Sequence, residues 1–149
     1  MQSVLEYLKV GINDGADVVA GGARVMAEGG GYFIAPTILA GLPPTSPVAM
    51  NEIFGPVVTV HPFRTIDEAI SIANATTYGL TASVWTSNLN AAMRFHRELR
   101  AGTVWVNCYE ASDVTSPFGG FKQSGNGRDR SLHAFDKYVE MKSTWIVSR

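Results

Sequence analysis

The sequence has little of what marks several large classes of protein. It contains one cysteine, Cys108, among 149 residues, so no disulfide can form within the chain. No apolar run approaches the length that a membrane-spanning helix needs. The first residues, MQSVLEYLKV, do not show the basic-then-apolar pattern of a secretory signal. Together these absences predict a cytoplasmic protein that neither spans nor binds a membrane.

Charge of either sign is also sparse. The chain carries 12 Lys and Arg against 13 Asp and Glu, for a net charge of −1, and no basic cluster stands out. Nucleic acid is therefore not an expected partner, because binding phosphates takes a concentrated basic surface. His61, His96 and His133 do not have the spacing of metal ligands, and no cluster of Cys or carboxylates completes a site. We expect no metal site.

The composition that remains is that of an ordinary globular domain, with 46% hydrophobic and 17% charged residues. Through the middle of the chain, strand and helix patterns alternate. Thr65 and Asn88 are expected to cap the two helices of this region. The order strand, helix, strand, helix, strand predicts an α/β fold with a parallel or mixed sheet flanked by helices. The three strands are expected at Val57–Pro62, Ala82–Trp85 and Thr103–Val106.

Outside this middle region the patterns are shorter. An apolar stripe at Val4, Leu5, Leu8 and Ile12 predicts an N-terminal helix. The remaining expectations are a buried strand at Ala16–Ala20, a loop or hairpin at Gly21–Gly31, an extended connection at Gly41–Asn51, a helix at Ser131–Tyr138 and a strand at Val139–Val147.

The glycine-dense run PFGGFKQSGNGRD invites comparison with a phosphate-binding loop. Gly120 and Gly125 have the required spacing, but Asn126 and Gly127 stand where Lys and Ser or Thr are needed. A tight structural turn is the better interpretation.

Cys108 follows the strand-like run TVWVN and admits two interpretations. As a nucleophile it would need a neighbouring base or a lowered pKa. A lone cysteine is more often a small buried hydrophobic residue. For Trp85, Trp105 and Trp145, which lie in strand-like runs, packing in a core or interface is the default.

The run NEIFGPVVTVHPF places a glutamate and a phenylalanine just before a strand. Gly55 permits a sharp turn and Pro56 fixes its backbone, so Glu52 and Phe54 are held at a corner. A carboxylate can accept hydrogen bonds from both hydroxyls of a ribose, and an aromatic ring can pack on a planar ring. This corner is a candidate binding site, and the alternative is a surface or helix-capping glutamate.

Four segments, NEIFGPVVTVHPF, TTYGLTASVWT, AGTVWVN and PFGGFKQSGNGRD, have the order and spacing found in the aldehyde dehydrogenase superfamily, which the chain resembles over nearly its whole length. Within that superfamily, GGFKQSGNGRDRSLHAF is similar to the bacterial branch that acts on amino-aldehydes such as γ-glutamyl-γ-aminobutyraldehyde. The resemblance implies oxidation of an aldehyde to a carboxylic acid with NAD or NADP. In that family a cysteine thiolate attacks the aldehyde, hydride passes to nicotinamide, and a glutamate activates water.

The resemblance also implies roles for particular residues. Glu52 matches the glutamate that holds the nicotinamide ribose, and Phe54 matches the phenylalanine beside the nicotinamide ring. Asn107 matches an asparagine that supports the catalytic loop, and Gly102 matches the glycine that opens the preceding strand. The segment CYEASD matches the segment that lines the aldehyde tunnel in family members. The resemblance therefore implies that the tunnel is lined by Cys108, Tyr109, Glu110 and Asp113.

The sequence also departs from the family pattern. It lacks the coenzyme domain, the motif of the catalytic cysteine and the general-base glutamate, so the resemblance implies no catalytic residue here. We expect residues 1–138 to be the C-terminal portion of the catalytic domain, and residues 139–149 to be a strand that joins the sheet of a neighbouring subunit in a homo-oligomer.

Three hypotheses follow. The chain is the C-terminal part of an aldehyde dehydrogenase, inactive alone. Alternatively it is a non-catalytic oligomerisation or interaction module, or a small thiol enzyme that uses Cys108.

Overall fold

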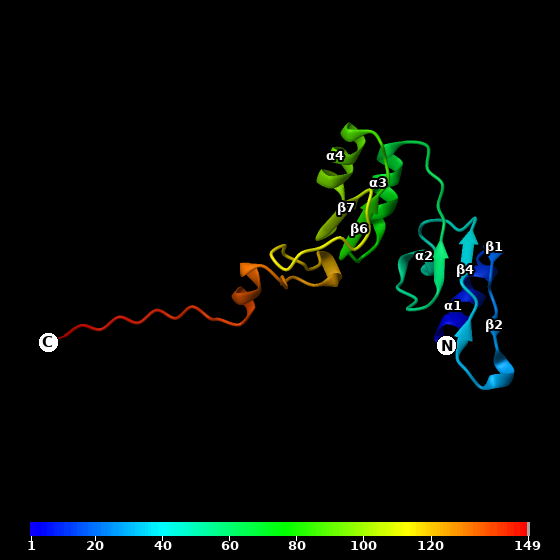
Figure 1. Cartoon of the computed structure of the whole chain (residues 1–149), viewed down its shortest axis with the longest axis horizontal. Coiled ribbons are helices and arrows are strands. Elements are labelled where there is room, and N and C mark those ends of the chain that lie inside the picture. Colours follow the sequence, from blue (N-terminus) through cyan, green and yellow to red (C-terminus); the bar gives the residue numbers. More distant parts are fainter. Residues whose placement is uncertain (149) are drawn as a thin grey trace. The chain divides into compact units, whose positions relative to one another are not determined.

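The computed structural model describes residues 1–148 (Figure 1). Two compact units, Met1–Thr76 and Thr77–Arg149, divide the chain, and each is taken by itself. The α-helices are α1 (Gln2–Asn13), α2 (Pro47–Met50), α3 (Ile66–Ala75) and α4 (Leu89–Glu98). The strands are β1 (Asp17–Ala20), β2 (Arg24–Val25), β3 (Phe33–Ile34), β4 (Thr37–Ala40), β5 (Val57–Thr59), β6 (Thr81–Val84) and β7 (Thr103–Val106). Three short 3₁₀ helices are η1 (Ala27–Gly29), η2 (Lys122–Ser124) and η3 (Leu132–Lys137).

The first unit is built on a three-stranded sheet in the order β1-β4-β5. Strand β1 runs antiparallel to β4, and β5 runs parallel to it. Helix α1 packs on this sheet so closely that a Cβ on Gly11 would lie 3.2 Å from Leu39 Cδ1. Leu8, Leu39, Leu42 and Val48 form the buried core between them. Leu39 of the central strand is fully buried in this core, and β5 pairs with the same strand. The core therefore fixes β5 and the segment that enters it.

Two expectations for this unit need correction. The run Ala16–Ala20 was expected to be buried, but all four residues of β1 are exposed because β1 is an edge strand. The connection Gly41–Asn51 is not wholly extended, since it contains α2. Ser46 caps that helix through its hydroxyl, which accepts from Val48 N and donates to Asp14 Oδ2. The predicted hairpin at Gly21–Gly31 is confirmed, as β2 and β3 pair antiparallel around it.

The second unit contains a parallel pair of strands joined by α4. Strands β6 and β7 pair from Thr81 beside Thr103 to Val84 beside Val106. Asn88 caps α4 as predicted, its side chain accepting from Ala91 N at 3.1 Å. The predicted parallel pairing is thus confirmed for these two strands, whereas β5 pairs with β4 in a different sheet.

The glycine-dense loop after β7 is a structural turn, as the sequence predicted. Phe121 N donates to Gly79 O, and Gly79 N donates to Ser124 Oγ, so the loop closes over the segment that leads into β6. Phe118 and Asp129 exchange two backbone hydrogen bonds where the loop returns on itself.

The end of the chain differs from expectation. The helix predicted at Ser131–Tyr138 is the 3₁₀ helix η3. Residues 139–148 form no strand but an extended trace (red in Figure 1), so the strand predicted at Val139–Val147 is not formed in the single chain. A strand is defined by its hydrogen-bonded neighbour, and none is present here. Within residues 1–148 no helix combines the length and apolarity needed to cross a bilayer.

Candidate functional site

The corner that carries Glu52 and Phe54 lies between α2 and β5, and three of its residues anchor it to the rest of the unit. Ile53 packs against the buried cluster. A Cβ on Gly55 would lie 2.7 Å from Val4 Cγ2, so only glycine lets the chain pass this close to α1. Pro56 O accepts from Thr37 N at 2.8 Å, which ties the corner to the start of β4. The backbone here is therefore fixed by packing and by hydrogen bonding.

The two candidate binding side chains point out of this anchored corner. Phe54 has 86% of its surface exposed and a left-handed backbone with φ of 53°. That conformation is costly for a bulky residue and is frequently found at functional sites. Glu52 is also exposed. An outward carboxylate two residues from an outward aromatic ring suits a ribose diol and an attached planar ring, so the residues present fit a nicotinamide nucleoside.

Gly102 stands where two backbones nearly touch. A Cβ on this residue would lie 1.6 Å from Gly119 O, a distance that no side chain can occupy. Gly102 N donates to Gly79 O at 3.1 Å. The opening of β7 is therefore clamped between the glycine-dense loop and the segment leading into β6, and Gly102 permits that contact.

Asn107 closes the other end of the same strand pair. Its Oδ1 accepts from Thr86 N and its Nδ2 donates to Thr86 O, both at 2.8 Å. Its backbone φ is 54°, a left-handed conformation that asparagine tolerates well. Asn107 thus joins the exits of β6 and β7 and sets the direction in which the chain leaves toward Cys108.

Trp105 supports the loop that follows. It is 9% exposed, and its Nε1 donates to Ala111 O at 2.7 Å. Its ring meets that of Tyr109 edge to face, with centroids 5.3 Å apart. A buried indole N–H needs an acceptor, and here the acceptor belongs to the loop itself. The sequence identified Trp105 only as a packing residue, so its contact with the loop is new.

Asp113 ends the loop in a local turn. Its Oδ1 accepts hydrogen bonds from the hydroxyl of Thr115 at 2.5 Å and from Thr115 N at 2.8 Å. Both bonds favour the charged form and lower the pKa of this carboxyl below its ordinary value.

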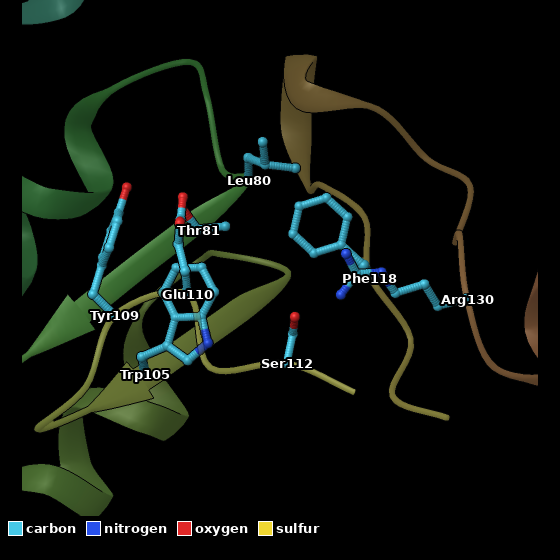
Figure 2. A pocket seen from close by; sticks show the side chains of 8 residues that line it. All are labelled: Leu80, Thr81, Trp105, Tyr109, Glu110, Ser112, Phe118 and Arg130. Carbon is cyan, nitrogen blue, oxygen red and sulfur yellow. The ribbon is translucent and has the colours of Figure 1, made fainter. Parts of the chain in front are cut away.

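A cleft of about 430 Å³ lies beside this loop (Figure 2). Trp105, Tyr109 and Glu110 line one side, and Phe118 and Arg130 face them in the close-up. The structure thus brings two of the four proposed tunnel residues, Tyr109 and Glu110, to one cleft. Leu80, Thr81 and Ser112 complete the lining.

The other two proposed tunnel residues, Cys108 and Asp113, are not among the residues that line it. Phe118 and Arg130 were not identified from the sequence, because they belong to the turn whose two ends are paired only in the folded chain.

Cys108 gains no support as a nucleophile from its surroundings. The residue is half-buried, and no hydrogen bond within residues 1–148 engages its thiol. The same part of the chain contains no group of three or more His, Cys, Asp or Glu that could hold a metal ion.

The fold belongs to a known class of protein. Residues 1–144 match the profile of the Aldehyde dehydrogenase family, and the chain is a member of that family. An indole-3-acetaldehyde dehydrogenase of P. syringae, solved with NAD+, is 58% identical with a TM-score of 0.91, over 97% of this chain and 29% of the other. A γ-glutamyl-γ-aminobutyraldehyde dehydrogenase from Burkholderia cenocepacia is 56% identical with a TM-score of 0.89, and the match covers 96% of this chain and 29% of the other.

Among sequence relatives, an aminoacetaldehyde dehydrogenase of Pseudomonas aeruginosa is 50% identical over 117 residues, which are 78% of this chain and 24% of the relative. The chain therefore spans less than a third of the length of these family members.

Proposed function

We propose that this chain serves the oxidation of an aldehyde to a carboxylic acid, with NAD or NADP as hydride acceptor, within a protein of full family length. The observation that carries the proposal is the outward-facing pair Glu52 and Phe54 on a corner that the core holds rigid. Family membership and the NAD+ bound in a similar structure support it.

In this proposal the coenzyme's nicotinamide end is held by two residues of the first unit. Glu52 accepts hydrogen bonds from the ribose hydroxyls, and Phe54 packs beside the nicotinamide ring. NAD or NADP supplies the acceptor for the hydride. Holding a reactant in a fixed orientation removes entropy from the barrier, which is what an anchored corner can provide.

The second unit would guide the aldehyde. Cys108, Tyr109, Glu110 and Asp113 are proposed to line its path, and Asn107 and Gly102 to hold the strands from which the loop departs. The hydrogen bonds of Asn107 to Thr86 and the close approach of Gly102 to Gly119 support this division of labour.

The proposed substrates are amino-aldehydes. Similarity to dehydrogenases for γ-glutamyl-γ-aminobutyraldehyde and aminoacetaldehyde supports this choice, as do the acidic residues Glu110 and Asp113 in the loop.

The isolated chain is proposed to be inactive, since its sole cysteine does not match the family nucleophile. A steady-state assay with coenzyme and a panel of aldehydes should show no turnover by the chain alone. In a family-length protein that contains it, Phe54→Ala should lower kcat roughly tenfold by loosening the nicotinamide. Phe63→Ala, at another exposed phenylalanine of the same unit, is the matched control and should stay within about twofold. Equal effects of the two changes would remove the proposed role of Phe54.

A second function is favoured by the C-terminal segment. Met141, Trp145, Ile146 and Val147 are each at least 88% exposed along a stretch that has no backbone partner within residues 1–148. Such a segment is a ready template for strand addition. The proposed role is homo-oligomerisation, which size-exclusion chromatography with light scattering tests.

A further inference from the structure

The cleft beside the loop is lined by two side chains of opposite charge. Glu110 and Arg130 both line it. Within residues 1–148 no ion pair or hydrogen bond engages either charged group, although Arg130 contacts an aromatic ring. Opposite charges that share a cleft without pairing leave both available to a ligand.

The backbone holds both residues in an unfavourable conformation. Glu110 has φ of 55° and Arg130 has φ of 59°, and Ser131 follows with φ of 52°. Non-glycine residues in the left-handed region cost free energy that the surrounding structure must supply, and they cluster at ligand sites. Hydrogen bonding holds the arginine end of this arrangement, because Ser131 N donates to Val114 O at 2.8 Å.

Arg130 is oriented by its neighbour Phe118. The paired backbones of Phe118 and Asp129 bring the two residues together, and the guanidinium carbon lies 5.4 Å from the centre of the Phe118 ring. Figure 2 shows the arginine side chain reaching back beside this ring, across from Tyr109 and Trp105. Stacking of this kind fixes the plane of a guanidinium while leaving its N–H donors free for a carboxylate.

We propose that this cleft binds the zwitterionic end of the substrate, an ammonium and a carboxylate on one carbon. The inference rests on the proposed aldehyde oxidation and narrows its substrate class. The guanidinium of Arg130 donates to the carboxylate, Glu110 accepts from the ammonium, and the rings of Trp105 and Tyr109 cover the aliphatic part. A site for amines alone would be weakened by Arg130, and a site for acids alone would be weakened by Glu110.

Three small molecules of matched shape test the charge requirement without coenzyme or turnover. Norleucine carries both charges, hexanoate lacks the ammonium, and pentylamine lacks the carboxylate. Binding to the 149-residue chain is followed by NMR, through the shift of the Trp105 indole N–H. Norleucine should bind roughly fivefold more tightly than either single-charge probe, because each exposed charge pair contributes modestly. Equal affinities for the three, or no norleucine binding at millimolar concentrations, would overturn the inference.

Charge-removing variants assign the roles. Arg130→Gln should weaken the binding of norleucine and hexanoate roughly fivefold and leave the binding of pentylamine unchanged. Glu110→Gln should weaken the binding of norleucine and pentylamine only. Arg130→Lys should retain part of the affinity for hexanoate. Arg64→Gln, on the first unit, is the control and should change nothing. An unaltered indole signal shows that each variant is folded, and equal losses for all three probes in Arg130→Gln would contradict the assignment.

The two proposals fail separately. If the full-length protein oxidises no aldehyde, the probe affinities still report on the cleft. If the probes do not discriminate while turnover persists, only the zwitterion inference falls.

Discussion

Asn107 and Thr86 are joined by two hydrogen bonds of 2.8 Å that run in opposite directions. One side chain thereby satisfies both the N–H and the C=O of a residue just past the neighbouring strand. Because parallel strands β6 and β7 end together, this pair fixes the geometry of their common exit. The loop that carries the proposed tunnel residues begins at the next position.

Replacing Asn107 should separate two contributions to stability. Asn107→Gly loses both hydrogen bonds but adopts the left-handed backbone without strain. It should lower the free energy of unfolding by about 1–2 kcal/mol. Asn107→Ala loses the same bonds and adds backbone strain of about 1 kcal/mol. Urea unfolding followed by tryptophan fluorescence measures both, since Trp85, Trp105 and Trp145 all lie in the second unit. A glycine variant as stable as the wild type would show that the bonds contribute nothing.

Gly102→Ala should be among the most damaging small changes in the second unit. The added Cβ would overlap the carbonyl of Gly119, so two backbones must separate. We expect a loss on the order of 3 kcal/mol or more, as for other severe steric clashes. Gly127→Ala is the matched control: its new Cβ would meet only the Lys137 side chain at 3.6 Å, an ordinary contact. Comparable denaturation midpoints for the two variants would refute the steric argument.

The sequence was sufficient to predict elements whose signals are local. The caps at Thr65 and Asn88 formed as predicted, because each depends only on a side chain and the next helical turn. Helix α2 had the same kind of signal, Ser46 followed by Pro47, but the surrounding prolines favoured an extended interpretation. The pairing of β5 with β4 instead of β6 depends on packing between segments distant in sequence.

For the candidate sites, the sequence predicts which residues to consider but not their geometry. The motif indicated Glu52 and Phe54 as candidate residues. The left-handed backbone at Phe54 could not be predicted, because neither phenylalanine nor its sequence neighbours indicate that conformation. The position of Arg130 in the cleft could not be predicted from the sequence. It lies beside Phe118 only because the backbones of Phe118 and Asp129 pair in the folded loop.

Trp105→Phe should make the loop of residues 108–113 more mobile while leaving most of the packing around residue 105 in place. The phenyl ring keeps most of the packing but loses the bond from Nε1 to Ala111 O, at a cost of about 1 kcal/mol. Hydrogen exchange should quicken over residues 108–113. Trp85→Phe is the control, because Trp85 is 68% exposed and should be replaceable with little change. Unchanged exchange in the Trp105 variant would mean that the indole bond does not restrain the loop.

Thr115→Val should raise the pKa of Asp113 toward the ordinary 3.8, because the largest cause of its lowering is the Thr115 hydroxyl. An Asp pKa that is lower in the folded state contributes stability above the unfolded pKa and loses it as pH falls through the folded one. The variant should therefore have a lower free energy of unfolding than the wild type at neutral pH. This difference should disappear as the pH falls below the Asp113 pKa of the folded protein. NMR titration of the carboxyl measures the shift, and an unchanged Asp113 pKa would contradict this cause.

The C-terminal segment offers the last test, because its proposed partner is a second copy of the chain. Strand addition needs backbone N–H donors, so Thr144→Pro should abolish it by removing one donor and fixing φ. Thr144→Ala keeps the donor and should self-associate as the wild type does. Light scattering across a concentration series distinguishes the two. If the proline variant still assembles, apolar side chains such as Trp145 and Ile146, and not strand pairing, drive the association.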